Sequence, residues 1–440
     1  MWKKLSKMMS RALGATTAGP GRGQRRPRRF RPALEGLQAR AVPATFMVTT
    51  TLDTVAPDGR LSLREAVSAA NTHPGADTIV VPAGVYRLSL RGADDTNAAG
   101  DLDVSGTTLF LGAGAGATVI DGQRIDRVFD ILGTAPHSTQ VAFQGLTVRN
   151  GLADAGGGGG IRVGNADLVV RGCVVTGNRT AGDGGGIANA ALPGTGNVTL
   201  VRSVVSRNVA GGEGGGLDVR SDSFGQGSVL NLGGSTIQGN IARAGGGILA
   251  FRLNLTGCAV SGNRATVGGG ISASTATLTS STVSGNQATD GDGGGIDART
   301  ATLTRSTVSG NSANGAGGGI NAAALTLLGV TVTNNSAHAG GGVFLQNGGT
   351  SSVGNSTIAD NLVDLGGVGP DLSGAFTSAG HNLIGDASGS TGFVNATNGD
   401  QVGTAANPID PRVAPLANNG GPARTHALPT GSPAIDPKED

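Results

Sequence analysis

Large aromatic side chains are scarce in this sequence: 440 residues contain ten Phe, one Tyr and one Trp. Since the core of a globular protein usually relies on large side chains, this core has to be built from small ones. No stretch reaches the ~20 apolar residues of a membrane-spanning helix, so no transmembrane segment is expected. Two cysteines, Cys173 and Cys258, are too few for a disulfide-rich scaffold.

Glycine, in contrast, is abundant, with 80 of the 440 positions against a usual ~7%. The glycines cluster in triplets instead of recurring at every third position, which excludes a collagen helix. Hydrophobic residues make up 38% of the chain, which argues against wholesale disorder.

Positive charge is concentrated at the start of the chain. The first 40 residues hold 3 Lys and 8 Arg against one Glu, so the remainder is acidic although the whole chain carries a net +2. We interpret residues 1–44 as a basic export leader or a disordered tail. The arginine run at 25–31 is interleaved with one aromatic residue only, Phe30, so no nucleic-acid partner is expected.

Two short strings recur in a constant phase, eight times each. Three glycines are followed by an aliphatic residue, namely Ile161, Ile187, Leu217, Ile248, Ile271, Ile296, Ile320 and Val343. Variants of Thr-Val-Ser-Gly-Asn end at Asn178, Asn208, Asn240, Asn263, Asn286, Asn311, Asn335 and Asn361. A period of about 26 residues is typical of a solenoid.

Each repeat contains three short segments of period-two alternation, separated by glycine-rich corners. This pattern predicts an all-β protein, a right-handed single-stranded parallel β-helix whose coils stack ~4.8 Å apart. Ser62 and Glu65 form a capping box that predicts one short helix over 62–71, within an N-terminal capping region. We expect the cap and first coils at 45–135, the repeats at 136–375, and a C-terminal coil and tail at 376–440.

The alternation also assigns the faces of the strands. The aliphatic residues point inward, and the asparagines end the third strand, where stacked amides are expected to form a structural ladder. Cys173 and Cys258 occupy one inward slot, three coils or ~14 Å apart. Since a disulfide requires Cα atoms within ~7 Å, the sequence predicts two buried free thiols.

Hydroxyl side chains form an outward array on the third strand of the later repeats. Its members are Thr282, Ser284, Thr307, Ser309, Thr331, Thr333 and Thr357. Threonine suits exposed strands by propensity, so the array is either a solvated face or a contact face for something flat and polar, such as a neighbouring surface protein, a glycan layer, ice or another crystal.

Three groups of residues resemble known families of bacterial surface proteins. The segment Leu61-Ser62-Leu63-Arg64-Glu65-Ala66 resembles the CSLREA signature, with leucine in place of the cysteine. The strings around Gly380-His381-Asn382, Asn418-Asn419-Gly420 and Gly431-Ser432-Pro433 resemble the choice-of-anchor region of bacterial surface proteins. The repeats resemble those of polymorphic outer membrane proteins. The resemblance implies a β-helix that is secreted or displayed at the cell surface, with an envelope or extracellular component as partner.

Catalytic chemistry has little support in the sequence. Glycoside hydrolysis requires two carboxylates ~5–9.5 Å apart, and the histidines have no metal-ligand spacing. Asp218 with Asp222, or Asp290 with Asp292, could approach each other and bind a cation weakly; otherwise no metal and no cofactor are expected. We therefore expect a structural or adhesive protein without catalysis. The alternatives are a polysaccharide lyase or glycoside hydrolase on a pectin-lyase-like β-helix, and a hydroxyl-array binder of ice or crystals.

Overall fold

The structure is a computed structural model that describes residues 42–92, 94–133, 137, 139–154, 156–189, 196–220 and 227–435. All of them belong to one compact unit, Ala41–Asp440. Asp222 lies outside the described residues. So does the predicted leader, except for residues 42–44.

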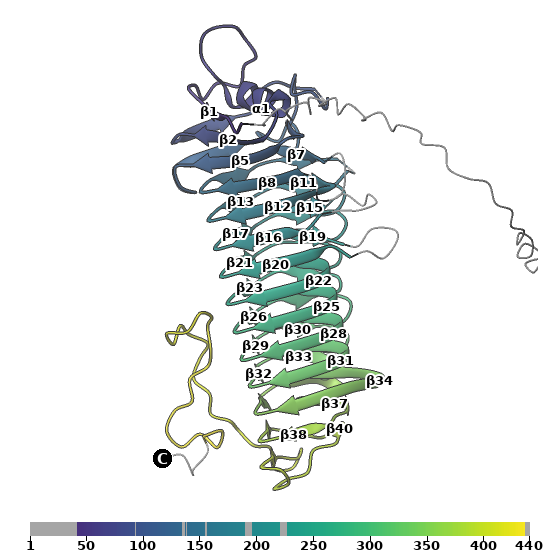
Figure 1. Ribbon diagram of the computed structural model, residues 1–440. Helices are drawn as coiled ribbons and strands as arrows, with labels where there is room; N and C mark the ends of the chain where they lie inside the picture. The colour runs from purple at the N-terminus through teal and green to yellow at the C-terminus, as the bar shows by residue number, and fades with distance from the viewer. Residues whose placement is uncertain are drawn as a thin grey trace, which may run out of the picture. The chain divides into compact units, whose positions relative to one another are not determined.

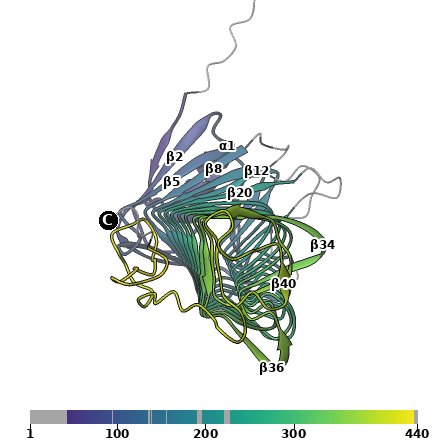
Figure 2. The same cartoon turned by 90° about the horizontal axis from the view of Figure 1, so that it is seen from below.

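The described chain winds into a parallel β-solenoid, which confirms the predicted fold class (Figures 1 and 2). Each strand pairs in parallel with its counterpart in the next coil, as Ile271, Ile296 and Ile320 do. Four sheets run along the solenoid. The helix α1 (Leu63–Thr72) lies at its N-terminal end.

The largest sheet has 20 strands, which fuse into longer bent strands in the later coils. They are β1 (Thr45–Met47), β2 (Ala76–Val81), β4 (Leu102–Val104), β5 (Thr107–Gly112), β7 (Phe129–Leu132), β8 (Thr139–Gln144), β11 (Ile161–Gly164), β12 (Ala166–Arg171), β15 (Ile187–Asn189), β16 (Val198–Val201), β19 (Leu217–Val219), β20 (Val229–Gly233), β22 (Ile248–Thr256), β25 (Ile271–Thr279), β28 (Ile296–Thr304), β31 (Ile320–Leu328), β34 (Val343–Gly354), β37 (Leu372–Ala375), β38 (Ser378–Gly380) and β40 (Ser390–Thr391).

The second sheet has 13 strands and carries the Thr-Val-Ser strings. They are β3 (Gly84–Arg87), β6 (Thr118–Asp121), β9 (Thr147–Arg149), β13 (Val174–Thr176), β17 (Val204–Ser206), β21 (Thr236–Gln238), β23 (Ala259–Ser261), β26 (Thr282–Ser284), β29 (Thr307–Ser309), β32 (Thr331–Thr333), β35 (Thr357–Ala359), β39 (Leu383–Ile384) and β41 (Gln401–Val402).

Two small sheets follow the ladder asparagines. One contains β10 (Leu152–Ala153), β14 (Arg179–Thr180) and β18 (Val209–Ala210). The other contains β24 (Arg264–Ala265), β27 (Gln287–Ala288), β30 (Ser312–Ala313), β33 (Ser336–Ala339) and β36 (Leu362–Val368).

The core is a stack of aliphatic side chains in register. The residue after each glycine triplet is fully buried in every repeat, and so is the Val or Ile of the third strand. Larger side chains fill the first coils, where the rings of Phe110, Phe129 and Phe143 lie 4.7–5.3 Å apart. Small aliphatic residues therefore make up the repeat core, whereas aromatic residues pack beneath the cap.

The glycine triplets are explained by their contacts with the next coil. Gly268 begins a triplet with a φ of +60°, a left-handed conformation that favours glycine. A Cβ atom on Gly270 would lie 2.6 Å from the carbonyl oxygen of Gly295 and 2.9 Å from the Asn286 side chain. The triplet is thus the place where the backbone passes closest to the next coil and to the ladder.

The eight asparagines form a continuous buried ladder. In Asn286 the backbone N–H and the side-chain amide both donate to Asn311 Oδ1, and the amide also donates to the Val260 carbonyl. The same pattern runs from Asn178 to Asn361, which donates to the buried carboxylate of Asp371. The ladder therefore connects successive coils by buried hydrogen bonds, as a structural element.

A second ladder uses the slot that contains the cysteines. Backbone N–H groups donate to the hydroxyl of the next coil, as Ser281 does to Ser306 Oγ, and Ser235 donates to Cys258 Sγ at 3.4 Å. Cys173 and Cys258 are both buried and free, which confirms the predicted thiols.

The cap depends on the segment that resembles the CSLREA signature. Ser62 caps α1 through a capping box with Glu65, as predicted. The Arg64 side chain is fully buried, forms an ion pair with Asp53 at 2.7 Å, and donates to the carbonyl groups of Ala99, Gly100 and Asp101. Arg64 and Glu65 therefore hold the cap together.

Candidate functional site

One outward column of side chains runs along the solenoid beside the buried aliphatic column. It is formed by the residue that follows each inward aliphatic, in register from coil to coil: Asp103, Asp130, Arg162, Ala188, Asp218, Leu249, Ser272, Asp297, Asn321, Phe344 and Ser373. We call this set the outer column. Its charged members gather in the first coils, and uncharged residues dominate the later ones.

Arg220 lies at the centre of an ion-pair cluster where β19 ends. Its guanidinium donates to both oxygens of Asp218 at 2.8 and 2.6 Å, to Glu213 at 2.7 Å, and to Asp183. Three carboxylates thus share one cation. Burial raises the pKa of Asp218 to about 7, and the neighbouring carboxylates of Asp183 and Glu213 add to the rise against the opposing effect of Arg220.

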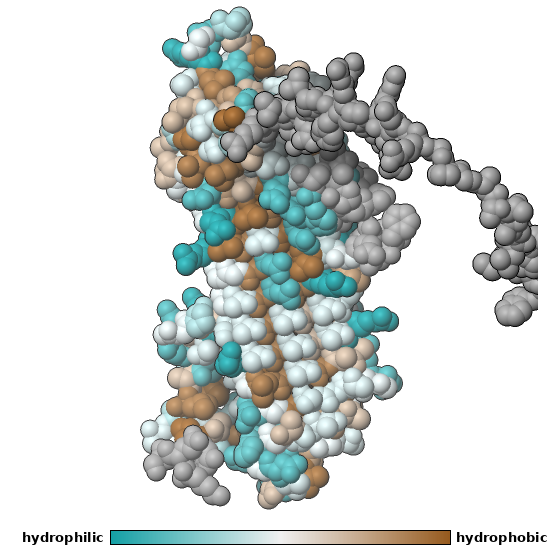
Figure 3. All heavy atoms as spheres, viewed as in Figure 1, coloured by the Kyte–Doolittle hydropathy of each residue, from teal (hydrophilic) through white to brown (hydrophobic). Residues whose placement is uncertain are grey.

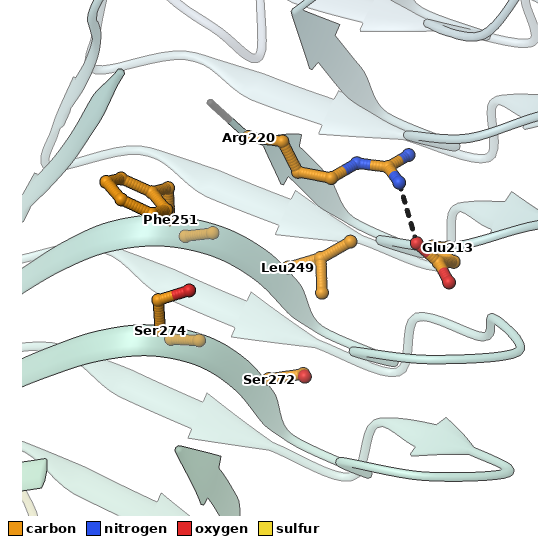
Figure 4. A pocket seen from close by; sticks show the side chains of 8 residues that line it. Glu213, Arg220, Leu249, Phe251, Ser272 and Ser274 are labelled. Atoms are coloured by element: carbon orange, nitrogen blue, oxygen red, sulfur yellow. Dashed lines mark hydrogen bonds and ion pairs between the residues drawn. The ribbon is translucent and has the colours of Figure 1, made fainter. Parts of the chain in front are cut away.

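A cavity of about 280 Å³ lies next to this cluster. It is lined by Glu213, Arg220, Leu249, Ala250, Phe251, Ser272, Ala273 and Ser274. Figure 4 shows the guanidinium of Arg220 directed toward Glu213, with Leu249 and Phe251 on the coil below and Ser272 and Ser274 on the next. Polar groups therefore border an apolar patch at the bend of β22 and β25.

The hydrogen bonds between Arg220 and the carboxylates limit the chemistry that this site can perform. Arg220 uses four hydrogen bonds of its five donors on carboxylates, so little of its charge remains for a ligand. Burial raises the pKa of Asp218 to about 7, so this carboxyl group could donate a proton close to neutral pH. The half-buried ring of Phe251 and the two serine hydroxyls suit the faces and edges of a sugar.

A second group of charged residues lies in the first coils. Carboxylate oxygens of Asp95, Asp103 and Asp130 lie within 4.8 Å of one another, and within the described ranges this is the one group of three acidic, histidine or cysteine side chains that converges on a point. Arg162 and Arg127 pair with Asp130. Burial raises the pKa of Asp101 to about 8 and of Asp103 to about 7. Asp95, Asp103 and Asp130 are therefore the described residues that could hold a metal ion.

The acidic residues that the sequence suggested as cation ligands have different surroundings in the structure. Asp218 belongs to the Arg220 cluster, and its expected partner Asp222 lies outside the described residues. Asp290 is exposed, and Asp292 accepts a hydrogen bond from the backbone of Ala316. In the parts of the chain that are described, these two do not join a convergent group.

The hydroxyl array differs from its expectation as an open outward face. Thr282, Thr307, Ser309 and Thr333 are buried, whereas Ser284, Thr331 and Thr357 are half-buried. The chain's own C-terminal segment runs beside β26 and β29 (Figure 1) and contacts two members of the array. Thr282 donates to the Arg424 carbonyl at 2.6 Å, and His426 Nε2 lies 2.9 Å from Ser309 Oγ. The middle of the array is therefore an intramolecular contact.

Sequence reasoning missed the Arg220 cluster, although a signal existed. Asp183 and Glu213 each stand directly before a glycine triplet, one coil apart, so they lie at the same corner of neighbouring coils. Asp218 follows the aliphatic residue after the second triplet, and Arg220 lies two residues on. Aligning the repeats on their triplets would have placed these four residues together.

No family model matches the chain, and no curated protein matches it. Among solved structures, it is similar to the A-modules of the mannuronan C-5 epimerases AlgE6 and AlgE4 from Azotobacter vinelandii, with 16% and 17% identity, TM-scores of 0.41 and 0.43, and coverage of 77% and 79% of this chain and 94% and 93% of theirs. It is also similar to the pectate lyase Pel9A, with 13% identity, a TM-score of 0.37 and 82% coverage of both chains. These values carry no argument about activity, so the chain is placed by its fold alone, as a parallel β-helix.

Proposed function

We propose that this protein is a secreted or cell-surface β-helical scaffold with a structural and adhesive role, and not a catalyst. The observation that supports this most directly is the saturation of Arg220 by Asp183, Glu213 and Asp218. An enzyme that cleaves or epimerises a polysaccharide needs charged side chains that are free to act on the substrate. Here the charged side chains of the site pair with one another.

The adhesive surface is the cavity beside the Arg220 cluster. Leu249 and Phe251 offer an apolar floor, and Ser272 and Ser274 offer hydroxyls at its edge. Such a surface suits a glycan of the cell envelope or the extracellular matrix, bound by ring contact and hydrogen bonds. The export expectation comes from the basic leader and from the resemblance to surface proteins. No helix within the described ranges is long and apolar enough to span a membrane.

Binding of extracellular polysaccharide to the purified protein tests the adhesive role. Phe251→Ser should weaken retention on a polysaccharide column by about 2- to 10-fold, since an aromatic contact is worth ~0.5–1.5 kcal/mol. The matched control is Phe344→Ser, which changes a half-buried phenylalanine of the outer column four coils further on. Equal retention of both variants would contradict the proposal.

Localisation requires its own experiment. Protease treatment of intact producing cells, followed by immunoblotting of the fractions, should find the protein outside the cytoplasm. A product confined to the cytoplasm would overturn the proposed surface role while leaving the glycan contact open to the binding assay.

A carbohydrate-active enzyme is the second candidate, and one observation favours it. The carboxyl of Asp218 has a pKa of about 7 beside the cavity, which is the range of a general acid. Incubation with uronate polymers, followed by detection of unsaturated or reducing ends, tests this candidate. Turnover that Asp218→Asn abolishes and Asp297→Asn preserves would establish the enzyme and refute the scaffold.

A further inference from the structure

The loop between β3 and β4 carries several acidic residues over the first coil. Asp95 lies in this loop, Asp103 lies in β4, and Asp130 is the register partner of Asp103 in β7. One carboxylate oxygen from each lies within 4.8 Å of the other two. Since Ca²⁺–oxygen distances are ~2.3–2.6 Å, one ion can contact all three.

Asp103 supplies an independent indication of a ligand. Its side chain is 1% exposed. Its Oδ2 accepts a hydrogen bond from the backbone of Asn97, whereas the buried Oδ1 has no hydrogen-bond partner among the described residues. A buried carboxylate oxygen without a partner is costly, so this atom is suited to a cation.

The charges around Asp103 are unbalanced. Six carboxylates gather there, those of Asp94, Asp95, Asp101, Asp103, Asp126 and Asp130. Two guanidinium groups oppose them: Arg162 pairs with Asp130, and Arg127 lies 3.1 Å from Asp101. When all six are ionised, four negative charges remain. A divalent cation would compensate half of that excess.

The shape of the loop is fixed by contacts that do not use Asp103 Oδ1. Arg64 donates to the carbonyl groups of residues 99–101. Asp94 accepts from the backbone of Ala98 and Ala99. Asn97, with a φ of +63°, exchanges hydrogen bonds with the backbone of Asp103. The loop is therefore preorganised, which reduces the entropy cost of binding.

We propose that Asp95, Asp103 and Asp130 form a Ca²⁺ site that joins the capping loop to the first two coils. The three donors are all carboxylate oxygens, which can bind in one- or two-oxygen mode, and this suits the variable coordination of Ca²⁺ better than the strict octahedron of Mg²⁺. Asp130 contributes while it remains paired with Arg162, since a carboxylate offers about four acceptor directions.

Isothermal titration calorimetry of the full chain, after treatment with a chelator, tests this proposal with CaCl₂ and, separately, MgCl₂. We expect one Ca²⁺ site, a higher Tm with Ca²⁺, and weaker binding of Mg²⁺. Asp103→Asn should raise the Kd at least ~10-fold. Asp95→Asn should do the same, and because Asp95 is exposed this variant keeps the test valid if Asp103→Asn does not fold.

Asp290→Asn is the matched control, since Asp290 is an acid of another loop and does not belong to the convergent group. Its Ca²⁺ affinity should equal that of the parent. The proposal is overturned if the parent binds no Ca²⁺ at millimolar concentration, if both Asp95→Asn and Asp103→Asn retain the parental affinity, or if Mg²⁺ binds as tightly as Ca²⁺.

Discussion

The first coils and the later coils of the solenoid are stabilised by different contacts. Beneath the cap, three phenylalanine rings pack together, and Arg64 is buried with four polar partners. From β22 to β31 the same contacts repeat at each step, with one aliphatic column, one asparagine ladder and one hydroxyl ladder. The surface follows the same division (Figure 3), with teal and brown residues mixed near the N-terminal end and a pale, regular face over the later coils.

This difference shows how a solenoid combines stability with a specific site. A repeated contact stabilises each coil through its neighbours, so the later coils need no unusual side chain. The N-terminal coil has no preceding coil, and its apolar end has to be covered by residues that occur once. Charged side chains accumulate at that end and at Arg220, and both candidate sites are therefore found where the repeat is irregular.

The largest expected effect comes from removing the central contact of the cap. Arg64→Ala removes the cation that pairs with Asp53 and the donor to three carbonyl groups. Breaking a buried ion pair by removing one partner costs about 3–5 kcal/mol. Urea denaturation should show a loss of this size.

Arg60→Ala is the control for the cap, because Arg60 is exposed and precedes the same helix. It should leave the free energy of unfolding unchanged. If the two variants were equally stable, the cap would not depend on the buried guanidinium.

Interrupting one step of the ladder should have the next largest effect. Asn286→Ala removes the acceptor of the Asn263 amide and of the Asn263 backbone N–H. The buried donors left unpaired should cost about 1–3 kcal/mol.

Ser284→Ala, two residues away on a half-buried position of β26, should be nearly neutral in the same denaturation experiment. A loss as large as that of Asn286→Ala would mean that the ladder contributes no more than the outer face does.

The regular coils were predictable because their contacts repeat with the sequence. The triplets, the inward aliphatic residues and the slot of Cys173 and Cys258 follow from period and alternation alone. The capping box of α1 followed from Ser62 and Glu65. In these places a local pattern decides the structure, so one sequence sufficed.

The irregular features were not predictable in the same way. Arg64 contacts a loop more than 30 residues away in the sequence, and no local sequence pattern predicts that contact. Asp183, Glu213 and Arg220 come together because two coils stack, which becomes visible only after the coils are aligned. The burial of Thr282 depends on Arg424, which is 142 residues away, and no period in the sequence relates the tail to the solenoid.

A pH titration of stability distinguishes the Arg220 region from the uncharged coils. Burial raises the pKa of Asp218 to about 7, above the ~3.9 of an unfolded chain. Between these values the native state binds more protons than the unfolded state, so the contribution of Asp218 to stability falls as the pH rises from about 4 to about 7.

Asp218→Asn should therefore show a shallower decline of Tm over this range, whereas Asp58→Asn, at an exposed position before the cap helix, should follow the parent. Identical slopes for the parent and Asp218→Asn would show that the Arg220 ion pairs hold Asp218 ionised throughout.

The smallest expected effect concerns the C-terminal segment on the second sheet. His426 contacts the Ala414 carbonyl at 2.6 Å and Ser309 Oγ at 2.9 Å, so His426→Ala loosens the segment without changing any coil. The free energy of unfolding should change by less than ~1 kcal/mol, while limited proteolysis should cut the segment faster than in the parent.

The control is His338→Ala, which removes a histidine paired with the exposed Asp364 and should leave the cleavage rate unchanged. Equal rates for His426→Ala and the parent would mean that the segment is held by its other contacts, such as the Arg424 carbonyl with Thr282, and that the hydroxyl array stays covered without the histidine.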